Sequence, residues 1–192
     1  TLMVAGAMYY SFSTGRSMAQ RYAPLVDAAM KIKLEATIAH LWFEELIGGD
    51  QYISIDSIWE HLDQAEWYAR AMLDGGENSE GKYLPIENAK IRQEVERAIT
   101  GIRAFRATAL ERWQNKDQSG IGSEIDQRFD KTFEDFGIAA DNVGTALRKQ
   151  MNSHLQQFSV LQISLIAITL FAGLFTGIMV HNNSKALMHS KN

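Results

Sequence analysis

The hydrophobic positions of this chain follow two patterns, an uninterrupted run and a helical repeat. The run extends from Val160 to Val180 and contains no Asp, Glu, Lys or Arg. About 20 apolar residues, each rising 1.5 Å along a helix, span the roughly 30 Å hydrocarbon core of a bilayer. A chain of only 192 residues has too little core to bury such a helix on every side. The run therefore predicts a transmembrane helix over residues 159–181.

A shorter apolar stretch, Leu2 to Phe12, lies near the start of the chain and carries no charge. It is too short to span a bilayer by itself. Because the sequence opens on Thr1 rather than Met, we expect a fragment whose upstream part is missing. We interpret residues 1–13 as the end of a first transmembrane helix. A cleaved signal peptide, with Ala5-Gly6-Ala7 as its small-residue site, is the alternative interpretation.

Residues 14–158 carry the helical repeat, in which apolar side chains recur at steps of three and four. Four stretches show this repeat, at residues 13–47, 54–74, 87–113 and from 123 onward. The scarcity of proline and of β-branched runs favours helices over a sheet. We therefore predict an all-α fold, an antiparallel up-down-up-down four-helix bundle flanked by transmembrane helices. The connections 48–53 and 116–123 then lie at one end, and a polar loop at 75–85 lies at the other.

Local signals refine the ends of these helices. Pro24 either kinks the first helix or makes it start afresh. Ser54 or Asp56 caps the second helix, and Ser123 caps the fourth. No proline follows Pro85, so we expect the fourth helix to continue into the membrane run without a break.

Composition narrows the classes of function. The net charge is −4 and no strong basic patch occurs, which argues against nucleic acid as a partner. The chain has no cysteine, which excludes disulfides, thiolate metal sites and cysteine chemistry. The segment Ser119 to Ser123 (SGIGS) lacks the lysine of a phosphate-binding loop. We therefore expect no enzyme and no cofactor in this chain.

Candidate ligand-binding residues gather toward the end of the bundle that holds the connections 48–53 and 116–123. These residues are Trp42, Glu44, Glu45, Trp59, Asp63, Trp67, Arg103, Arg106, Trp113, Asp126 and Asp130. Tryptophan faces beside carboxylates suit a cationic amine, and the arginines suit an acid equally well. Each tryptophan has packing in the core as its alternative, and Arg103 and Arg106 have internal pairing with Glu44 or Asp63 as theirs.

A divalent metal is the alternative to a small organic ligand. His40 and Glu44 lie four residues apart and project from one helix face, where His61 from the neighbouring helix can join them. Histidines that are solvated or satisfied within the core are the other interpretation.

The layout of the whole chain resembles the extracytoplasmic sensor region of bacterial transmembrane receptors: chemoreceptors, sensor histidine kinases and membrane diguanylate cyclases. This resemblance implies a homodimer in the inner membrane, with the bundle in the periplasm. It also implies that a small ligand shifts the fourth helix and signals to a cytoplasmic output domain. A ligand-free structural or dimerising ectodomain is the alternative. Residues 182–192 would begin a cytoplasmic linker, and they lack the proline that opens a HAMP helix.

Two narrower expectations accompany this resemblance. The stretch around His40 is similar to the helical zinc-binding domain of some chemoreceptors, but the cysteine and the later histidine pair of that family are absent. The seam Val143, Leu147, Met151 and Leu155 on the fourth helix steps by four. It packs either against a partner chain or against the first helix of its own chain.

Overall fold

The computed structural model describes residues 2–189. The first residue of the predicted first membrane helix and residues 190–192 of the predicted linker lie outside this range. The chain divides into two units. We call Met18–Met151 the helical unit, and we call Thr1–Ser17 together with Asn152–Asn192 the apolar unit.

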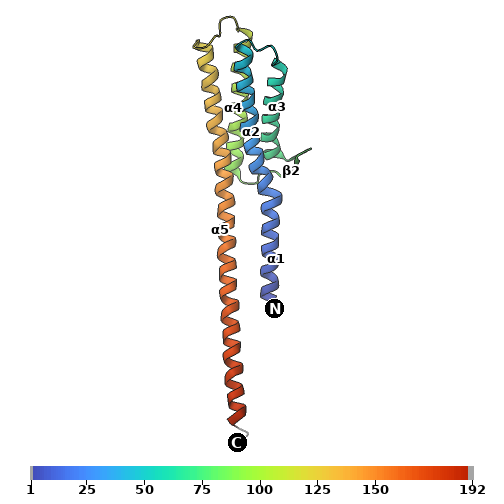
Figure 1. Cartoon of the computed structure of the whole chain (residues 1–192), viewed down its shortest axis with the longest axis vertical. Helices are drawn as coiled ribbons and strands as arrows, with labels where there is room; N and C mark the ends of the chain where they lie inside the picture. Colours follow the sequence, from blue (N-terminus) through green and yellow to red (C-terminus); the bar gives the residue numbers. More distant parts are fainter. Residues whose placement is uncertain (1, 190–192) are drawn as a thin grey trace. The chain divides into compact units, whose positions relative to one another are not determined.

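Helices dominate the described residues, which confirms the predicted all-α class (Figure 1). The helical elements are α1 (Leu2–Ser17), the π-helical turn η1 (Met18–Tyr22), α2 (Ala23–Ile47), α3 (Ile55–Asp74), α4 (Ala89–Gln114) and α5 (Glu124–His189). The predicted run of the fourth helix into the apolar stretch without a break is confirmed by the bounds of α5. The arrangement as an up-down-up-down bundle with flanking membrane helices stays a prediction.

The helix ends follow the local signals of the sequence. Ser54 caps α3 by accepting a hydrogen bond from the Ser57 amide at 3.1 Å. The hydroxyl of Ser123 accepts from the Asp126 amide at 3.2 Å, as expected for the cap of α5. Pro24 lies in the first turn of α2, where the missing N–H costs no helical hydrogen bond. The backbone stays helical before this proline, because α1, η1 and α2 follow one another directly and a π-helical turn precedes Pro24.

The polar loop predicted at residues 75–85 contains regular structure that was not predicted from the sequence. This segment forms a two-stranded antiparallel hairpin of β1 (Gly76–Asn78) and β2 (Gly81–Tyr83). The side chain of Asn78 closes its turn by accepting from the amides of Glu80 and Gly81 at 3.0 and 3.2 Å. Strands of three residues are too short to show an alternating pattern, so only the turn could be predicted from the sequence.

One hydrophobic core holds α2, α3, α4 and the part of α5 within the helical unit together. Its centre is aromatic, with the rings of Phe105 and Phe43 at 4.9 and 4.8 Å from that of Phe129. Val143 and Leu147 of α5 are also buried in this core. Half of the predicted seam on the fourth helix therefore packs within its own chain.

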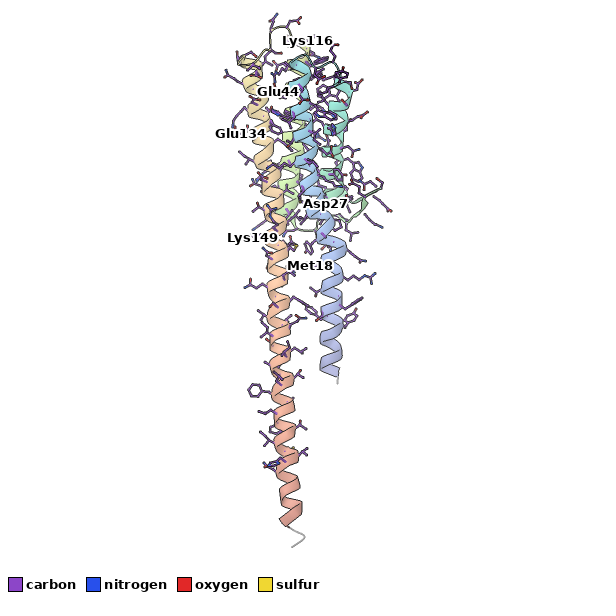
Figure 2. All side chains as sticks on the ribbon, in the orientation of Figure 1. Met18, Asp27, Glu44, Lys116, Glu134 and Lys149 are labelled. Carbon is purple, nitrogen blue, oxygen red and sulfur yellow. The ribbon has the colours of Figure 1, made fainter. Side chains whose placement is uncertain are left out.

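The connections between helices and the points where the chain enters and leaves lie at opposite ends of the helical unit. Figure 2 shows Glu44 and Lys116 near the end with the connections after α2 and α4, and Met18 and Lys149 near the opposite end. At this second end, the amide of Gln150 donates a hydrogen bond to the hydroxyl of Tyr22 at 3.1 Å. The chain therefore enters and leaves the helical unit at neighbouring positions.

Within the apolar unit, α1 lies beside the part of α5 that follows Met151. The rings of Tyr10 and Phe158 stack at 6.5 Å, and the amide of Gln162 donates to the hydroxyl of Ser11 at 3.4 Å. Among the described residues, one helix is long and apolar enough to cross a membrane, within Glu124–Asn182. The potential of the predicted run to span a membrane is thereby supported. The role of α1 as the end of another membrane helix stays a prediction.

Candidate functional site

A buried arginine joins three helices of the helical unit. Arg112, in the last turn of α4, is fully buried. Its guanidinium binds the carboxylate of Glu44 from α2, with one contact at 3.2 Å, and that of Asp126 from α5 at 2.6 Å. A buried charge of this kind is tolerated only when it is paired and hydrogen-bonded. The three side chains therefore form one charged network inside the core.

Further contacts of Arg112 involve Ser119 and two phenylalanine rings. Its Nε donates to the carbonyl of Ser119 at 3.3 Å, and the hydroxyl of Ser119 donates back to the carbonyl of Arg112 at 2.9 Å. The guanidinium also lies 4.9 Å from the ring centre of Phe129 and 5.7 Å from that of Phe43. The network thus fixes the connection between α4 and α5 as well as the helices themselves.

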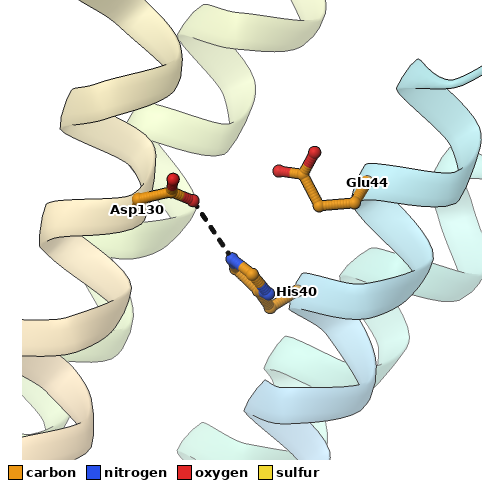
Figure 3. A group of neighbouring side chains, drawn as sticks. All are labelled: His40, Glu44 and Asp130. Atoms are coloured by element: carbon orange, nitrogen blue, oxygen red, sulfur yellow. Dashed lines mark hydrogen bonds and ion pairs between the residues drawn. The ribbon is translucent and has the colours of Figure 1, made fainter. Parts of the chain in front are cut away.

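His40 lies one turn before Glu44 on α2. Its ring stacks on Phe133 at 4.1 Å and on Phe129 at 5.1 Å, so its plane is set by aromatic packing. Its Nε2 lies 3.4 Å from Oδ1 of Asp130 on α5. In Figure 3 the side chains of His40, Glu44 and Asp130 point toward one another across the space between the two helices.

These three side chains form a compact set of metal-ligand atoms. One ring nitrogen of His40 and one carboxylate oxygen each of Glu44 and Asp130 lie within 4.8 Å of one another. The side chains of Glu44 and Asp130 are 31% and 60% exposed, so the set opens to solvent on one side. The set and the Arg112 network share Glu44. We call His40, Glu44, Arg112, Asp126 and Asp130 the polar cluster.

The predicted metal set of His40, Glu44 and His61 is not brought together. His61 points its Nδ1 at Oε2 of Glu35, at 2.6 Å, and Trp42 packs edge-on against its ring at 4.7 Å. Glu35 lies five residues before His40, about 140° away around α2. His61 therefore lies on a different face of α2, and Asp130 takes its place beside His40 and Glu44.

Two predicted arginines pair within the protein rather than line a common pocket. Arg106 binds Asp63, which is one of the internal pairs considered from the sequence, and it also donates to the carbonyl of Trp59 at 3.0 Å. Arg103 binds Glu66 at 2.8 Å instead of Glu44 or Asp63. Burial raises the pKa of Glu66, but hydrogen bonds from Arg103 and Arg70 outweigh it and leave this pKa below its ordinary value.

The remaining candidates are spread over the helical unit. Trp67 packs edge-on against Tyr68 and Tyr83 beside the hairpin. Trp113 carries the ammonium of Lys116 over its ring at 4.9 Å, and Glu45 is exposed on α2. Of the eleven predicted ligand-binding residues, only Glu44, Asp126 and Asp130 belong to the polar cluster.

Arg112 was not among the predicted site residues. An arginine in the last turn of a helix is normally interpreted as a solvated residue whose charge complements the helix dipole. A signal was present in its spacing, because Ile102, Phe105, Ala109 and Arg112 follow one another at steps of three, four and three. Arg112 thus occupies the buried face of α4, and a charge there requires partners.

A separate group of polar side chains holds the hairpin against the helices, and it was not predicted from the sequence. Glu80 in the hairpin turn accepts hydrogen bonds from the ammonium of Lys31 and, at 2.5 Å, from the hydroxyl of Tyr68. The Lys31 bond, then the Tyr68 bond, hold the pKa of Glu80 below its ordinary value. The bond to Glu80 also raises the pKa of Lys31. These contacts tie β1 and β2 to α2 and α3.

A shallow groove of about 310 Å³ runs between α2 and α5 on the surface of the helical unit. It is lined mainly by apolar and small residues, among them Met30, Leu34, Ala140 and Gly144. The ion pair of Lys33 with Asp141, at 2.8 Å, bridges the same two helices. Met30 and Leu34 are more than half exposed, so this face carries apolar surface into solvent.

Comparisons with known proteins leave the function to be argued from this geometry. No protein-family model, no curated protein and no solved structure matches the chain.

Proposed function

We propose that the helical unit is the sensing domain of a membrane-anchored signalling receptor of bacterial type. In this proposal α2, α3, α4 and the first part of α5 form an up-down-up-down four-helix bundle in the periplasm. The apolar run of α5 crosses the inner membrane, and α1 is the end of a second membrane helix. The residues after the run begin a cytoplasmic linker to an output domain.

One observation carries this proposal. The chain enters and leaves the helical unit at neighbouring positions, as the hydrogen bond between Gln150 and Tyr22 indicates. The exit is through α5, and the same helix contains the stretch that is apolar enough to span a membrane. Adjacent ends of this kind suit a domain that is inserted between two neighbouring membrane helices.

The polar cluster supports a place for the sensed ligand. It lies where α2, α4 and α5 meet, at the end of the helical unit opposite the entry and exit of the chain (Figure 2). A ligand that changes the spacing of Glu44 and Asp130 changes the spacing of α2 and α5. Receptors commonly use small shifts of packed helices of this kind to carry a signal.

The outer face of α2 supports a homodimer. Met30, Leu34 and Leu41 are exposed and lie four and seven residues apart, which is the spacing of a seam between two helices. Because Val143 and Leu147 are buried within their own chain, we propose this α2 face as the dimer seam.

Cysteine crosslinking in membranes tests the dimer. The chain has no cysteine, so Met30→Cys, Leu34→Cys and Leu41→Cys can each be made without removing another thiol. We expect disulfide-linked dimers from these variants and none from Gln64→Cys, an exposed position on α3. Equal crosslinking at Gln64, or none at the three α2 positions, would contradict the seam.

Thermal unfolding separates a sensor from a purely structural ectodomain. A ligand that binds only the folded state at a hundredfold excess over its Kd stabilises that state by about 2.7 kcal/mol. We expect at least one compound of a panel of amines, carboxylic acids and divalent metals to raise the unfolding temperature of the protein in nanodiscs. A panel without any effect would favour the ligand-free alternative.

A further inference from the structure

We propose that His40, Glu44 and Asp130 bind a divalent first-row transition metal ion, for which Zn²⁺ is the probe. The proposal deepens the function proposed above, since it rests on a sensing role for the polar cluster and names the chemical class of what is sensed. The ion would link α2 to α5.

The spacing of the ligand atoms fits such an ion. Zinc binds imidazole nitrogen and carboxylate oxygen at about 2.0–2.2 Å, which places neighbouring ligands of a tetrahedral ion roughly 3.3 Å apart. Nε2 of His40 and Oδ1 of Asp130 lie 3.4 Å apart, which is long for a hydrogen bond. One oxygen of Glu44 lies within 4.8 Å of a ring nitrogen of His40 and of a carboxylate oxygen of Asp130.

Two of the three ligands are already held in place. The ring of His40 is fixed by its stacks on Phe129 and Phe133. The carboxylate of Glu44 is held by the buried guanidinium of Arg112. Partners of this kind orient metal ligands and strengthen binding. The side chains therefore lose little conformational entropy when the ion binds.

The charge of the polar cluster favours a dication. Glu44, Asp126 and Asp130 supply three negative charges, and Arg112 supplies one positive charge. With His40 neutral, as metal ligation requires, two negative charges remain for the ion to balance. The positive charge of Arg112 weakens binding, but it lies on the buried side of Glu44, whereas Asp130 is 60% exposed on the solvent side.

The ligand types select the class of metal. Imidazole suits zinc, copper, iron and nickel, and carboxylate is shared by these ions with the harder magnesium and calcium. One imidazole with two carboxylates therefore favours a first-row transition metal over calcium. Three protein ligands leave further positions to water on the exposed side.

The test measures zinc binding by the whole chain in nanodiscs after the protein has been stripped with a chelator. Calorimetric titration with ZnCl₂ and elemental analysis after dialysis report affinity and stoichiometry. We expect one zinc ion per chain. His40→Gln and Asp130→Asn should each weaken binding by more than about tenfold, because even the loss of an outer partner costs about 10–100-fold.

Two matched variants serve as controls. His61→Gln removes the histidine that pairs with Glu35, and Asp135→Asn removes an exposed carboxylate five residues further along α5. Both should bind zinc as the unchanged protein does. Asp130 is exposed, so Asp130→Asn should fold normally and its result does not depend on the stability of the core.

No stoichiometric zinc in the unchanged protein would overturn the proposal. Binding that survives both His40→Gln and Asp130→Asn would overturn it equally, since the ion would then lie elsewhere. Stabilisation by an amine that Asp130→Asn abolishes, without zinc binding, would assign the cluster to an organic cation instead. The dimer seam and the membrane topology are tested by separate crosslinking and labelling experiments. Failure of the metal site can therefore be distinguished from failure of the proposed receptor.

Discussion

Arg112 organises the interior of the helical unit more than any other charged side chain in the described residues. It contacts Glu44, Asp126 and Ser119 and lies over two phenylalanine rings. The sequence predicted that Glu44, Asp126 and Asp130 lie toward one end of the helices. The inward orientation of Arg112 was not predicted, although its spacing from Phe105 and Ala109 carries that signal, because arginine is mostly exposed in proteins. Long-range partners such as Glu35 for His61 leave no local signal at all.

Replacement of Arg112 tests the energy of this network. Arg112→Met leaves Glu44 and Asp126 without their shared partner, and we expect a loss of about 3–5 kcal/mol in the free energy of unfolding. Urea unfolding followed by tryptophan fluorescence measures it, because all four tryptophans lie in the helical unit.

Arg128→Met is the matched control for this change. Arg128 also joins α5 to α4, through Glu111, but it is half exposed, and surface pairs contribute about 0–1 kcal/mol. Equal losses from the two variants would show that the buried network is no stronger than a surface ion pair.

Glu80 gives the hairpin a dependence on pH. Its pKa is lower in the folded protein than its ordinary value of 4.5, since Lys31 and Tyr68 donate to its carboxylate. Such a group stabilises the fold above its unfolded pKa, and the contribution is lost as the pH falls through the folded pKa. The protection factors of the amides of β1 and β2, which are exchange rates corrected for the intrinsic pH dependence of exchange, should therefore fall on acidification below about pH 4.5.

The variant Glu80→Gln should remove this acid dependence and leave the hairpin equally mobile at neutral and acid pH. Glu77→Gln changes an exposed carboxylate of the same hairpin and should keep the dependence unaltered. If Glu77→Gln removed it instead, the proposed bonding of Glu80 to Lys31 and Tyr68 would not be its cause.

At the scale of elements, periodicity and caps were sufficient to predict the helices. The start of α3 after its cap Ser54 follows from local chemistry that acts within one turn. The hairpin was not predictable, because its strands are held by contacts of Glu80 and Tyr83 with distant helices. Helix pairing was likewise beyond the sequence, as Val143 and Leu147 fit either a partner chain or their own core.

Alanine substitutions at two helical glycines should change the stability of the fold in opposite directions and so test the packing of α4 on α5. A Cβ at Gly101 would lie 3.1 Å from Cα of Phe136, whereas a Cβ at Gly137 meets nothing within 4 Å. In Gly101→Ala, overpacking of about 1–3 kcal/mol outweighs the gain of about 1 kcal/mol in helix propensity. In Gly137→Ala only the gain remains.

We therefore expect Gly101→Ala to lower the urea midpoint and Gly137→Ala to raise it. The same fluorescence measurement reports both. A higher midpoint for Gly101→Ala would mean that α4 and α5 are not in close backbone contact at this position.

At the scale of the whole molecule, the two ends of α5 lie on opposite sides of a membrane in the proposed receptor. The sequence alone predicted this division, because an uncharged run of this length is the strongest signal that a chain can carry. Which end of α5 is cytoplasmic is inferred from a weaker signal, chiefly the lysines Lys185 and Lys191 after the run.

Labelling of single cysteines tests this assignment most directly. Gln127→Cys lies at the start of α5, and Lys185→Cys follows the apolar run. In intact bacterial spheroplasts, a membrane-impermeant maleimide should label Gln127→Cys at once, and it should label Lys185→Cys only after the membrane is permeabilised. Labelling of both positions in intact spheroplasts, or protection of Gln127→Cys, would contradict a sensing unit held outside the membrane by a crossing helix.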